Sequence, residues 1–299
     1  MSRSRRRRRA IEGSGKFTVW VGHRVSRSAL LLAGFVVASS GCFVSSAVGA
    51  GTEGPAAELE LGIGTAWSPD FSGSSASVAQ LRIWASGTYR SAEHGTFALD
   101  SGSLTIDPEL RWNFVDSPDA GLGVLLGYRP GRNDRKPTFF GRNSGSESLR
   151  GLPTVPATVD LGAQGYVAVY GLPLFAQLRS AVGSAQGTLV IVGAFATFSV
   201  GADAEMTVLP TATWADARQM RAFYGVGAEA SAASGFSPYA PRAGWQNAAL
   251  EFGGDWRIVR EWHLVASVAY ERLLAGAAGS PIVGAKNQLS GLIGLAWHY

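Results

Sequence analysis

The chain has 299 residues, of which 46% are hydrophobic and 16% charged, with 39 glycines and one cysteine. The first fifty residues hold nine of the 26 Lys and Arg residues and one of the 22 Asp and Glu residues. Residues 51–299 therefore carry 17 bases and 21 acids, a net charge of −4. The excess of basic residues comes from the first fifty residues, so it does not support nucleic-acid binding by the rest of the chain. The one cysteine, Cys42, leaves residues 51–299 without a disulfide framework or a cysteine-based metal site.

Residues 1–50 have the pattern of an export signal with an extended basic n-region. Arginines at positions 3, 5–9, 24 and 27 and a lysine at 16 precede an uncharged, mostly apolar stretch from Ala29 to Val48. The stretch ends in small residues, and we predict a signal peptide cleaved after Ala50. A transmembrane helix is the first alternative, because the stretch approaches the required length of about 20 residues. Lipidation of Cys42 is the second, but Ser39 stands where a branched apolar residue is expected.

Short alternating segments recur through residues 51–299, and no long helical apolar period interrupts them. Near position 110, for example, Leu110, Trp112 and Phe114 alternate with Glu109, Arg111 and Asn113. This period of two indicates strands with one apolar and one polar face. A soluble sandwich shows the same alternation with the apolar face turned inward. The leader and the aromatic residues near strand ends favour a transmembrane barrel, with lipid outside and a polar lumen inside.

The alternation predicts one domain, 51–299, folded as an all-β, antiparallel transmembrane β-barrel of about twelve strands, with ten or fourteen as alternatives. The expected strands cover 57–68, 78–88, 95–105, 107–116, 121–131, 158–170, 173–183, 187–200, 204–214, 245–258, 261–274 and 287–299. If both ends of the barrel chain lie in the periplasm, every second connection is extracellular. The long connections 132–157, 215–244 and 275–286 then all lie outside, as bacterial barrels require.

The last strand ends in an aromatic residue. Tyr299, Trp297, Leu295 and Ile293 fall on the face expected to meet lipid, and Gly294 falls on the other face. The spacing of Gly294, Trp297 and Tyr299 resembles the C-terminal signal by which bacterial outer-membrane barrels are recognised for insertion. We therefore expect this strand to close the barrel and the protein to lie in the cell outer membrane.

A series of short motifs identifies a family. Trp214-Ala215-Asp216 and Phe223-Tyr224-Gly225-Val226 are followed by Tyr270-Glu271-Arg272-Leu273-Leu274 and Ser280-Pro281-Ile282-Val283. Upstream come Ser68-Pro69-Asp70-Phe71 and Leu149-Arg150-Gly151-Leu152. In order and spacing these resemble the MipA/OmpV family of outer-membrane proteins. The resemblance implies a scaffold whose partners are a lytic transglycosylase, MltA, and a murein polymerase. Gly276 and Gly279 stand where the family usually carries acidic residues, which argues against a cation role for that loop.

The chemistry of the barrel residues does not favour an enzyme. Only His94, His263 and His298 are available as bases, and the expected topology places all three at the periplasmic end. His263 and His298 lie on adjacent strands and could approach one another as a metal or pH-sensing pair, or simply fill a polar lumen. We predict no cofactor, no catalytic residue and no metal.

The alternation also directs a set of charged side chains into the lumen. They are Glu109, Arg111, Glu251, Asp255, Arg257 and Glu271. Their mixed signs favour either an internal ion-pair network or a selective conducting path. We expect Arg257 and its neighbours to pair with Glu271 or Arg111 across the interior. The basic run at 131–136 is expected to be exposed, where it would meet either lipopolysaccharide phosphates or solvent.

The function that the sequence favours is therefore a non-enzymatic outer-membrane scaffold linked to murein assembly. Outer-membrane lipid and lipopolysaccharide surround it, and the partners come from the family resemblance alone. The alternative is a narrow, porin-like channel for small solutes. An outer-membrane enzyme is the least favoured.

Overall fold

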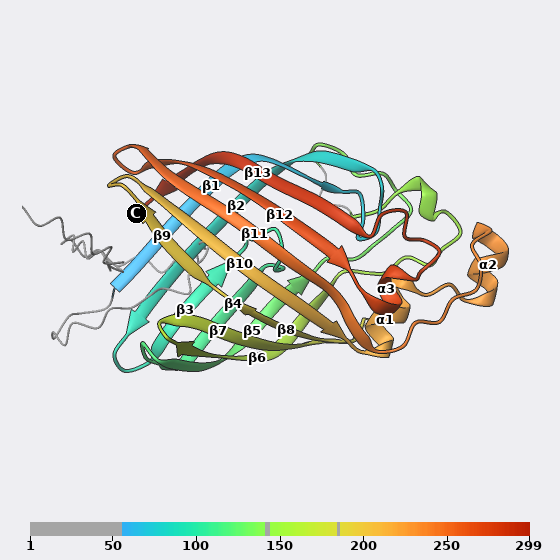
Figure 1. Cartoon of the computed structure of the whole chain (residues 1–299), viewed down its shortest axis with the longest axis horizontal. Helices are drawn as coiled ribbons and strands as arrows, with labels where there is room; N and C mark the ends of the chain where they lie inside the picture. The colour runs from blue at the N-terminus through green and yellow to red at the C-terminus, as the bar shows by residue number, and fades with distance from the viewer. Residues whose placement is uncertain (1–55, 141–143, 184–185) are drawn as a thin grey trace, which may run out of the picture.

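The strands follow one another around a closed wall in which every hydrogen-bonded pair of strands is antiparallel (Figure 1). The computed structural model describes residues 56–140, 144–183 and 186–299. The predicted signal peptide lies outside the described residues. This includes both the cleavage site at Ala50 and the cysteine at position 42. Among the described residues, no helix is long and apolar enough to cross a membrane.

The observed strands agree closely with the expected ones. They are β1 Ala56–Pro69, β2 Ser77–Ser91, β3 Gly95–Asp100, β4 Glu109–Asp116, β5 Ala120–Arg129, β6 Thr158–Val169, β7 Leu172–Ala181, β8 Thr188–Ala194, β9 Ala196–Val200, β10 Ala204–Ala215, β11 Gly244–Val259, β12 Trp262–Leu273 and β13 Asn287–His298. The wall closes where β1 pairs with β13, with Ile63 opposite Leu295. The predicted antiparallel barrel is confirmed.

The expected strand 187–200 is broken at one residue. Both β8 and β9 pair with β10, and only Phe195 separates them. The side chain of Phe195 is buried in a cluster with Phe175 and Leu209. The break therefore turns an aromatic ring into the interior without adding a strand, and the described barrel has the predicted twelve.

One expected pair of strands is corrected. Strands were predicted over 95–105 and 107–116, but β3 ends at Asp100 and β4 begins at Glu109. Residues 101–108, here called the inner loop, leave the wall and enter the lumen. The composition Ser-Gly-Ser-Leu-Thr-Ile-Asp-Pro is consistent with this departure, because Gly weakens a strand and Pro108 cannot donate to a ladder.

The two ends of the barrel differ in their connections. The turn end carries 92–94, 117–119, 170–171, 201–203 and 260–261, together with the C-terminus marked in Figure 1. At 170–171 both Tyr170 and Gly171 have positive φ, +52° and +80°, as a two-residue type I′ hairpin turn requires. The loop end carries 70–76, 130–157, 182–187, 216–243 and 274–286. Short and long connections thus segregate as the sequence predicted.

The outer wall is apolar and ringed by aromatic residues at both ends. Exposed aliphatic side chains such as Ile63, Ile83 and Leu161 cover the middle. Exposed rings near the loop end are Trp67, Tyr128, Trp245 and Tyr270, and those near the turn end include Tyr89, Trp112, Trp256, Trp262 and Tyr299. An apolar band between two aromatic girdles is the outer face of a barrel that sits in a bilayer.

The loops of the loop end pack on one another and form a lid, visible in Figure 1 beside α1, α2 and α3. The helices are α1 Ala217–Tyr224, α2 Ala228–Ser234 and α3 Ala275–Ala278, with a short 3-10 turn, η1, at Glu147–Leu149. Asp216 caps α1 by accepting a hydrogen bond from the Gln219 amide at 2.7 Å.

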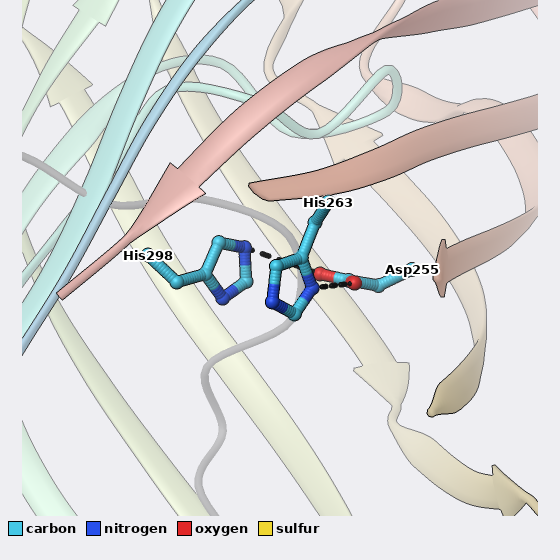
Figure 2. Close-up of side chains that lie close together, drawn as sticks. All are labelled: Asp255, His263 and His298. Atoms are coloured by element: carbon cyan, nitrogen blue, oxygen red, sulfur yellow. Dashed lines mark hydrogen bonds and ion pairs between the residues drawn. The ribbon is translucent and has the colours of Figure 1, made fainter. Parts of the chain in front are cut away.

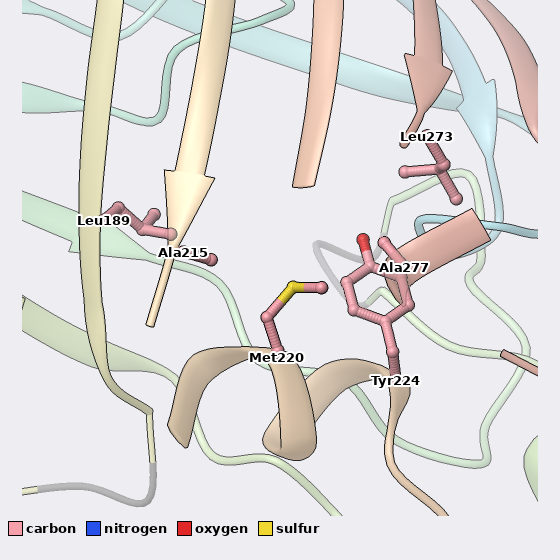
Figure 3. Packing of buried hydrophobic residues seen from close by; sticks show 6 residues of the cluster. All are labelled: Leu189, Ala215, Met220, Tyr224, Leu273 and Ala277. Carbon is pink, nitrogen blue, oxygen red and sulfur yellow. The ribbon is translucent and has the colours of Figure 1, made fainter. Parts of the chain in front are cut away.

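Figure 3 shows the first core of this lid, where Met220 and Tyr224 of α1 meet Ala277 of α3. A second core joins the connections 70–76, 130–157, 216–243 and 274–286. Its buried residues are Phe71, Leu149, Leu152, Val226 and Ile282. The lid therefore has hydrophobic cores of its own, each contributed by segments far apart in the sequence.

Candidate functional site in the barrel interior

A chain of buried ion pairs lines the wall formed by β4, β5, β6 and β7, and is here called the wall network. Glu109 lies 3.5 Å from both Arg111 Nε and Arg179 Nη1. Asp160 lies 3.3 Å from Arg179 Nε and 2.9 Å from Arg129 Nη2. All five side chains are at most 5% exposed. Three guanidinium groups thus alternate with two carboxylates in a water-poor space, where each charge depends on its partners.

Neutral groups complete the wall network and fix its position. Gln177 Nε2 donates to Glu109 Oε1 at 2.8 Å, and Arg129 Nη1 donates to Gln219 Oε1 at 2.9 Å. The second bond ties the wall to helix α1 of the lid. Gly127 leaves room for the network, because a Cβ there would lie 2.1 Å from Arg179 Nη2. The network and the lid are therefore one connected structure.

The inner loop is anchored across the lumen by a single carboxylate. Glu251 of β11 accepts hydrogen bonds from the backbone amide of Leu104, at 3.1 and 3.2 Å, and from Ser103 Oγ at 2.8 Å and Thr105 Oγ1 at 2.9 Å. Charge-assisted bonds of this kind are stronger than neutral ones. Glu251 is buried, and the hydrogen bonds from three consecutive residues of the inner loop offset part of the cost of burying its charge.

Apolar side chains of the inner loop reach opposite walls. Leu104 packs against the cluster of Trp84 and Leu292, on the side of β2, β12 and β13. Ile106 packs against the cluster of Phe175 and Ile191, on the side of β7 and β8. Arg82 of β2 also donates to the Ser101 carbonyl at 2.8 Å. The inner loop therefore crosses the lumen and contacts the wall on both sides.

A different group of side chains lines the lumen at the turn end. Asp255 of β11, His263 of β12 and His298 of β13 lie together in Figure 2 and are here called the histidine cluster. Asp255 Oδ1 contacts His263 Nδ1, and Asp255 Oδ2 lies 3.2 Å from His298 Nε2. The two imidazole rings stack in parallel with centroids 3.8 Å apart. Side-chain exposures of 17% to 33% make the cluster accessible from the turn end.

Glu60 of β1 extends the histidine cluster on the other side of the barrel seam. Its Oε2 lies 3.6 Å from His298 Nε2, and its Oε1 accepts a hydrogen bond from the Trp84 indole. The indole lies over Gly62 and Gly294, where an added Cβ would come within 2.0 Å and 2.6 Å of it. Gly294 is thus a packing position for Trp84, which explains a glycine at this point of the last strand.

At the loop end, Arg132 corrects one expectation about the basic run 131–136. Arg132 is buried and donates to the Phe223 carbonyl at 2.6 Å, so it supports the lid and does not face lipopolysaccharide. Burial lowers the pKa of Arg132 to about 10. Arg135 and Lys136 of the same run are exposed. Tyr224, whose hydroxyl lies 2.8 Å from Ser72 Oγ, is also buried, and burial raises its pKa.

The comparison with protein families shows to which family the chain belongs. The family model described as MltA-interacting protein MipA matches residues 61–299. The chain belongs to the MipA family. This confirms the family resemblance read from the sequence motifs, and the MipA-family chain is accordingly an outer-membrane β-barrel.

Solved outer-membrane barrels resemble the MipA-family chain in fold but hardly in sequence. OmpT of Vibrio cholerae is 7% identical, with 82% of this chain and 97% of that chain covered and a TM-score of 0.33. The anion-selective porin of Comamonas acidovorans is 10% identical, with coverages of 82% and 99% and a TM-score of 0.37. The COG4313 outer membrane channel of Pseudomonas putida F1 is 11% identical, with coverages of 81% and 95% and a TM-score of 0.41. No curated protein matches the chain.

Three of the predicted lumen charges, Glu109, Arg111 and Glu251, are buried, and the partners of the predicted charges differ from the expected ones. Glu109 and Arg111 belong to the wall network, while Glu251 holds the inner loop. Glu271 lies on the inner face of β12 beside Asn247, whose side chain bonds to it. The expected pairing of Arg257 with Glu271 or Arg111 is wrong. Arg257 pairs with Asp203 in the 201–203 turn, because that turn lies directly beside its end of β11.

Sequence reasoning missed Arg129, Asp160 and Arg179 as members of the wall network. Asp160 and Arg179 lie on expected strands, so their inward direction follows from the same alternation that singled out Glu109. At the other end, Trp297 and Tyr299 stack with centroids 5.9 Å apart, and Tyr299 is exposed. The role of Gly294, Trp297 and Tyr299 in insertion stays a prediction.

Proposed function

We propose that this MipA-family barrel is a membrane-embedded scaffold that binds murein enzymes at its turn end and does not conduct solutes through its lumen. The observation that carries the proposal is the inner loop, which crosses the lumen beneath the lid. Four hydrogen bonds to Glu251 and two apolar contacts hold it there. A lumen crossed in this way favours function on the outer surfaces of the molecule.

The family name supplies the class of partner. The model that matches is described as an MltA-interacting protein, and we infer that this chain binds a lytic transglycosylase of that type. A murein polymerase is the second partner that we propose. Murein lies in the periplasm, so the partner must meet the end of the barrel that faces it, which we take to be the turn end.

The charge of the turn end suggests how such a partner would be recognised. Exposed acidic side chains lie in or beside its short connections, namely Glu93, Asp116, Asp119, Asp203 and Glu261. Two arginines, Arg257 and the exposed Arg260, lie among them, so these connections form an acidic rim with an excess of negative charge. Such an excess favours a basic partner surface and accelerates association at low salt. We therefore propose a basic face on the bound enzyme.

The experiment that tests the scaffold uses the purified barrel immobilised in detergent. A lytic transglycosylase of the MltA type should be retained by the wild-type barrel, and retention should weaken as salt is raised. Glu93→Lys combined with Asp119→Lys should reduce it at least tenfold. The matched control combines Glu147→Lys in η1 with Glu229→Lys on α2, which makes the same change of charge at the loop end and should retain the enzyme normally.

A channel for small solutes is the alternative, and one observation favours it. The inner loop is held on one side through a single carboxylate, and polar contacts can be released without unfolding the wall. Planar-bilayer recordings of the wild-type barrel separate the two functions. Few and brief openings are expected of the scaffold, whereas large, steady conductance together with no retention of the enzyme would establish the channel.

A further inference from the structure

We propose that the histidine cluster is a binding site for a divalent transition metal ion, of which Zn²⁺ is the reference case. The site would take one nitrogen from His263, one nitrogen from His298 and one carboxylate oxygen from Asp255. These three ligand atoms all lie within 4.8 Å of one another. Two imidazoles and one carboxylate form a donor set that suits zinc and neighbouring transition metals better than Ca²⁺ or Mg²⁺.

The spacing of the donors agrees with a shared ion. Ligands about 2.0–2.1 Å from a tetrahedral zinc are separated from one another by roughly 3.3 Å. Asp255 Oδ2 and His298 Nε2 are 3.2 Å apart. Asp255 Oδ1 contacts the ring of His263, so one carboxylate reaches a nitrogen of each imidazole, as the dashed lines in Figure 2 show.

The hydrogen bonding of His298 supplies an independent observation. Its Nε2 atom is shielded from solvent and has no hydrogen bond of acceptable geometry, although the Asp255 and Glu60 carboxylates lie nearby. One buried imidazole nitrogen thus faces two carboxylates, an arrangement that attracts a cation. A metal ion placed between the nitrogen and the carboxylate would satisfy both.

The barrel wall positions the three ligands before any ion binds. Each lies on the inner face of a different strand, and the backbone pairing fixes their order: Asp255 lies diagonally across from His263, and Glu60 lies directly opposite His298. Glu60 Oε2 stands beside the site, 3.6 Å from His298 Nε2, and adds a second negative charge there. An ion at this point would join β11, β12 and β13 next to the seam with β1.

The test uses the whole barrel purified in detergent without a histidine tag and titrated with Zn²⁺ alone in a calorimeter. We expect one saturable ion per barrel, with affinity lowered at least tenfold in each of His263→Ala, His298→Ala and Asp255→Asn. His94→Ala is the matched control, because His94 is exposed in the turn 92–94 at the same end. It should bind Zn²⁺ as the wild type does.

Two further measurements separate a lost ligand from a lost fold. Each variant is used only if it keeps the heat-modifiable mobility of a folded barrel, and His298→Gln replaces His298→Ala where it does not. Zn²⁺ should raise the melting temperature of the wild type and of His94→Ala but not of the cluster variants. Co²⁺ should give the visible absorption of a four-coordinate site.

Three outcomes would overturn the proposal. The first is the absence of saturable Zn²⁺ binding to the wild type. The second is unchanged affinity when both His263 and His298 are replaced, which would place the ion elsewhere. The third is displacement of Zn²⁺ by millimolar Ca²⁺, which would assign binding to carboxylates alone.

Discussion

The two halves of the lumen use charge in opposite ways. Toward the loop end, guanidinium and carboxylate groups alternate in the wall network, and almost none of their surface meets water. Toward the turn end, the ionisable groups are imidazoles and carboxylates, partly open to solvent, with Arg257 as a cation at the rim.

The difference shows which half carries stability and which remains available for binding. Removing one partner from a buried pair leaves a charge without compensation, whereas an exposed pair gains little from its partner. The wall network, the inner loop and the lid therefore form the structural half. The histidine cluster and the acidic rim form the half that other molecules can reach.

The largest expected effect concerns which membrane face each half meets. In a Cys42→Ser background, a cysteine at Ala232 on α2 should react on whole cells with a maleimide that cannot cross membranes. A cysteine at Asp119 in the turn end should react only after the outer membrane is permeabilised. Both positions are exposed, so the reverse pattern would invert the orientation and remove the turn end as a docking surface.

Replacing Arg179 should produce the largest loss of stability. Arg179→Met leaves Glu109 and Asp160 without a cation that contacts both. The free energy of unfolding should fall by about 3–5 kcal/mol, the usual cost of breaking a buried pair. Urea unfolding followed by tryptophan fluorescence measures it. A loss below about 1 kcal/mol would show that the network is hydrated and contradict its description as structural.

Glu251→Gln should release the inner loop while keeping the shape of the side chain. Three residues of the inner loop lose charge-assisted hydrogen bonds. One hydrogen bond to a charged group contributes roughly 1.5–3 kcal/mol to stability. We expect steady bilayer conductance where the wild type shows little. Glu205→Gln, which changes a lumen-facing carboxylate at the turn end, is the control. Equal conductance in both variants would mean that the inner loop does not limit passage.

Met220→Ala should loosen the lid without opening the wall. Met220 of α1 is fully buried in a cluster with Leu189 and Tyr224. Truncating a buried methionine to alanine costs about 2–5 kcal/mol. Amide hydrogen exchange should accelerate in α1 and change little in the strands. Arg221→Ala, an exposed position on the same helix, should leave exchange as it is. Faster exchange throughout the barrel would show that lid and wall unfold together.

The smallest effect is expected at Arg257. Its side chain is 36% exposed and that of its partner Asp203 is 61% exposed, so solvent screens the pair. A double-mutant cycle between Arg257→Met and Asp203→Asn should give a coupling of at most about 1 kcal/mol, reduced further by salt. A coupling of about 3–5 kcal/mol, the size expected for a buried pair of the wall network, would contradict the difference between the two halves.

The sequence determined the strands and their faces because alternation is a local property. A side chain at every second position must lie on the same side of a strand, whatever lies across the lumen. For this reason the strand ranges, the segregation of long and short connections and the inward direction of Glu109, Arg111 and Glu251 all follow from the residues. Where the chain leaves the wall, as at 101–108, alternation loses its meaning and the strand assignment was wrong.

Only the tertiary structure decided which charges meet. The partner of a lumen residue depends on the register around the closed wall and on loops that enter from above, and neither is encoded near the residue itself. Arg257 pairs with Asp203 in an adjacent turn, Glu251 accepts hydrogen bonds from the inner loop, and Arg132 donates a hydrogen bond to the lid. The sequence placed His263 and His298 on adjacent strands, as a metal or pH-sensing pair or as lumen filler, without Asp255. The stacking of the two rings, with Asp255 in contact with a nitrogen of each, required three strands in fixed register.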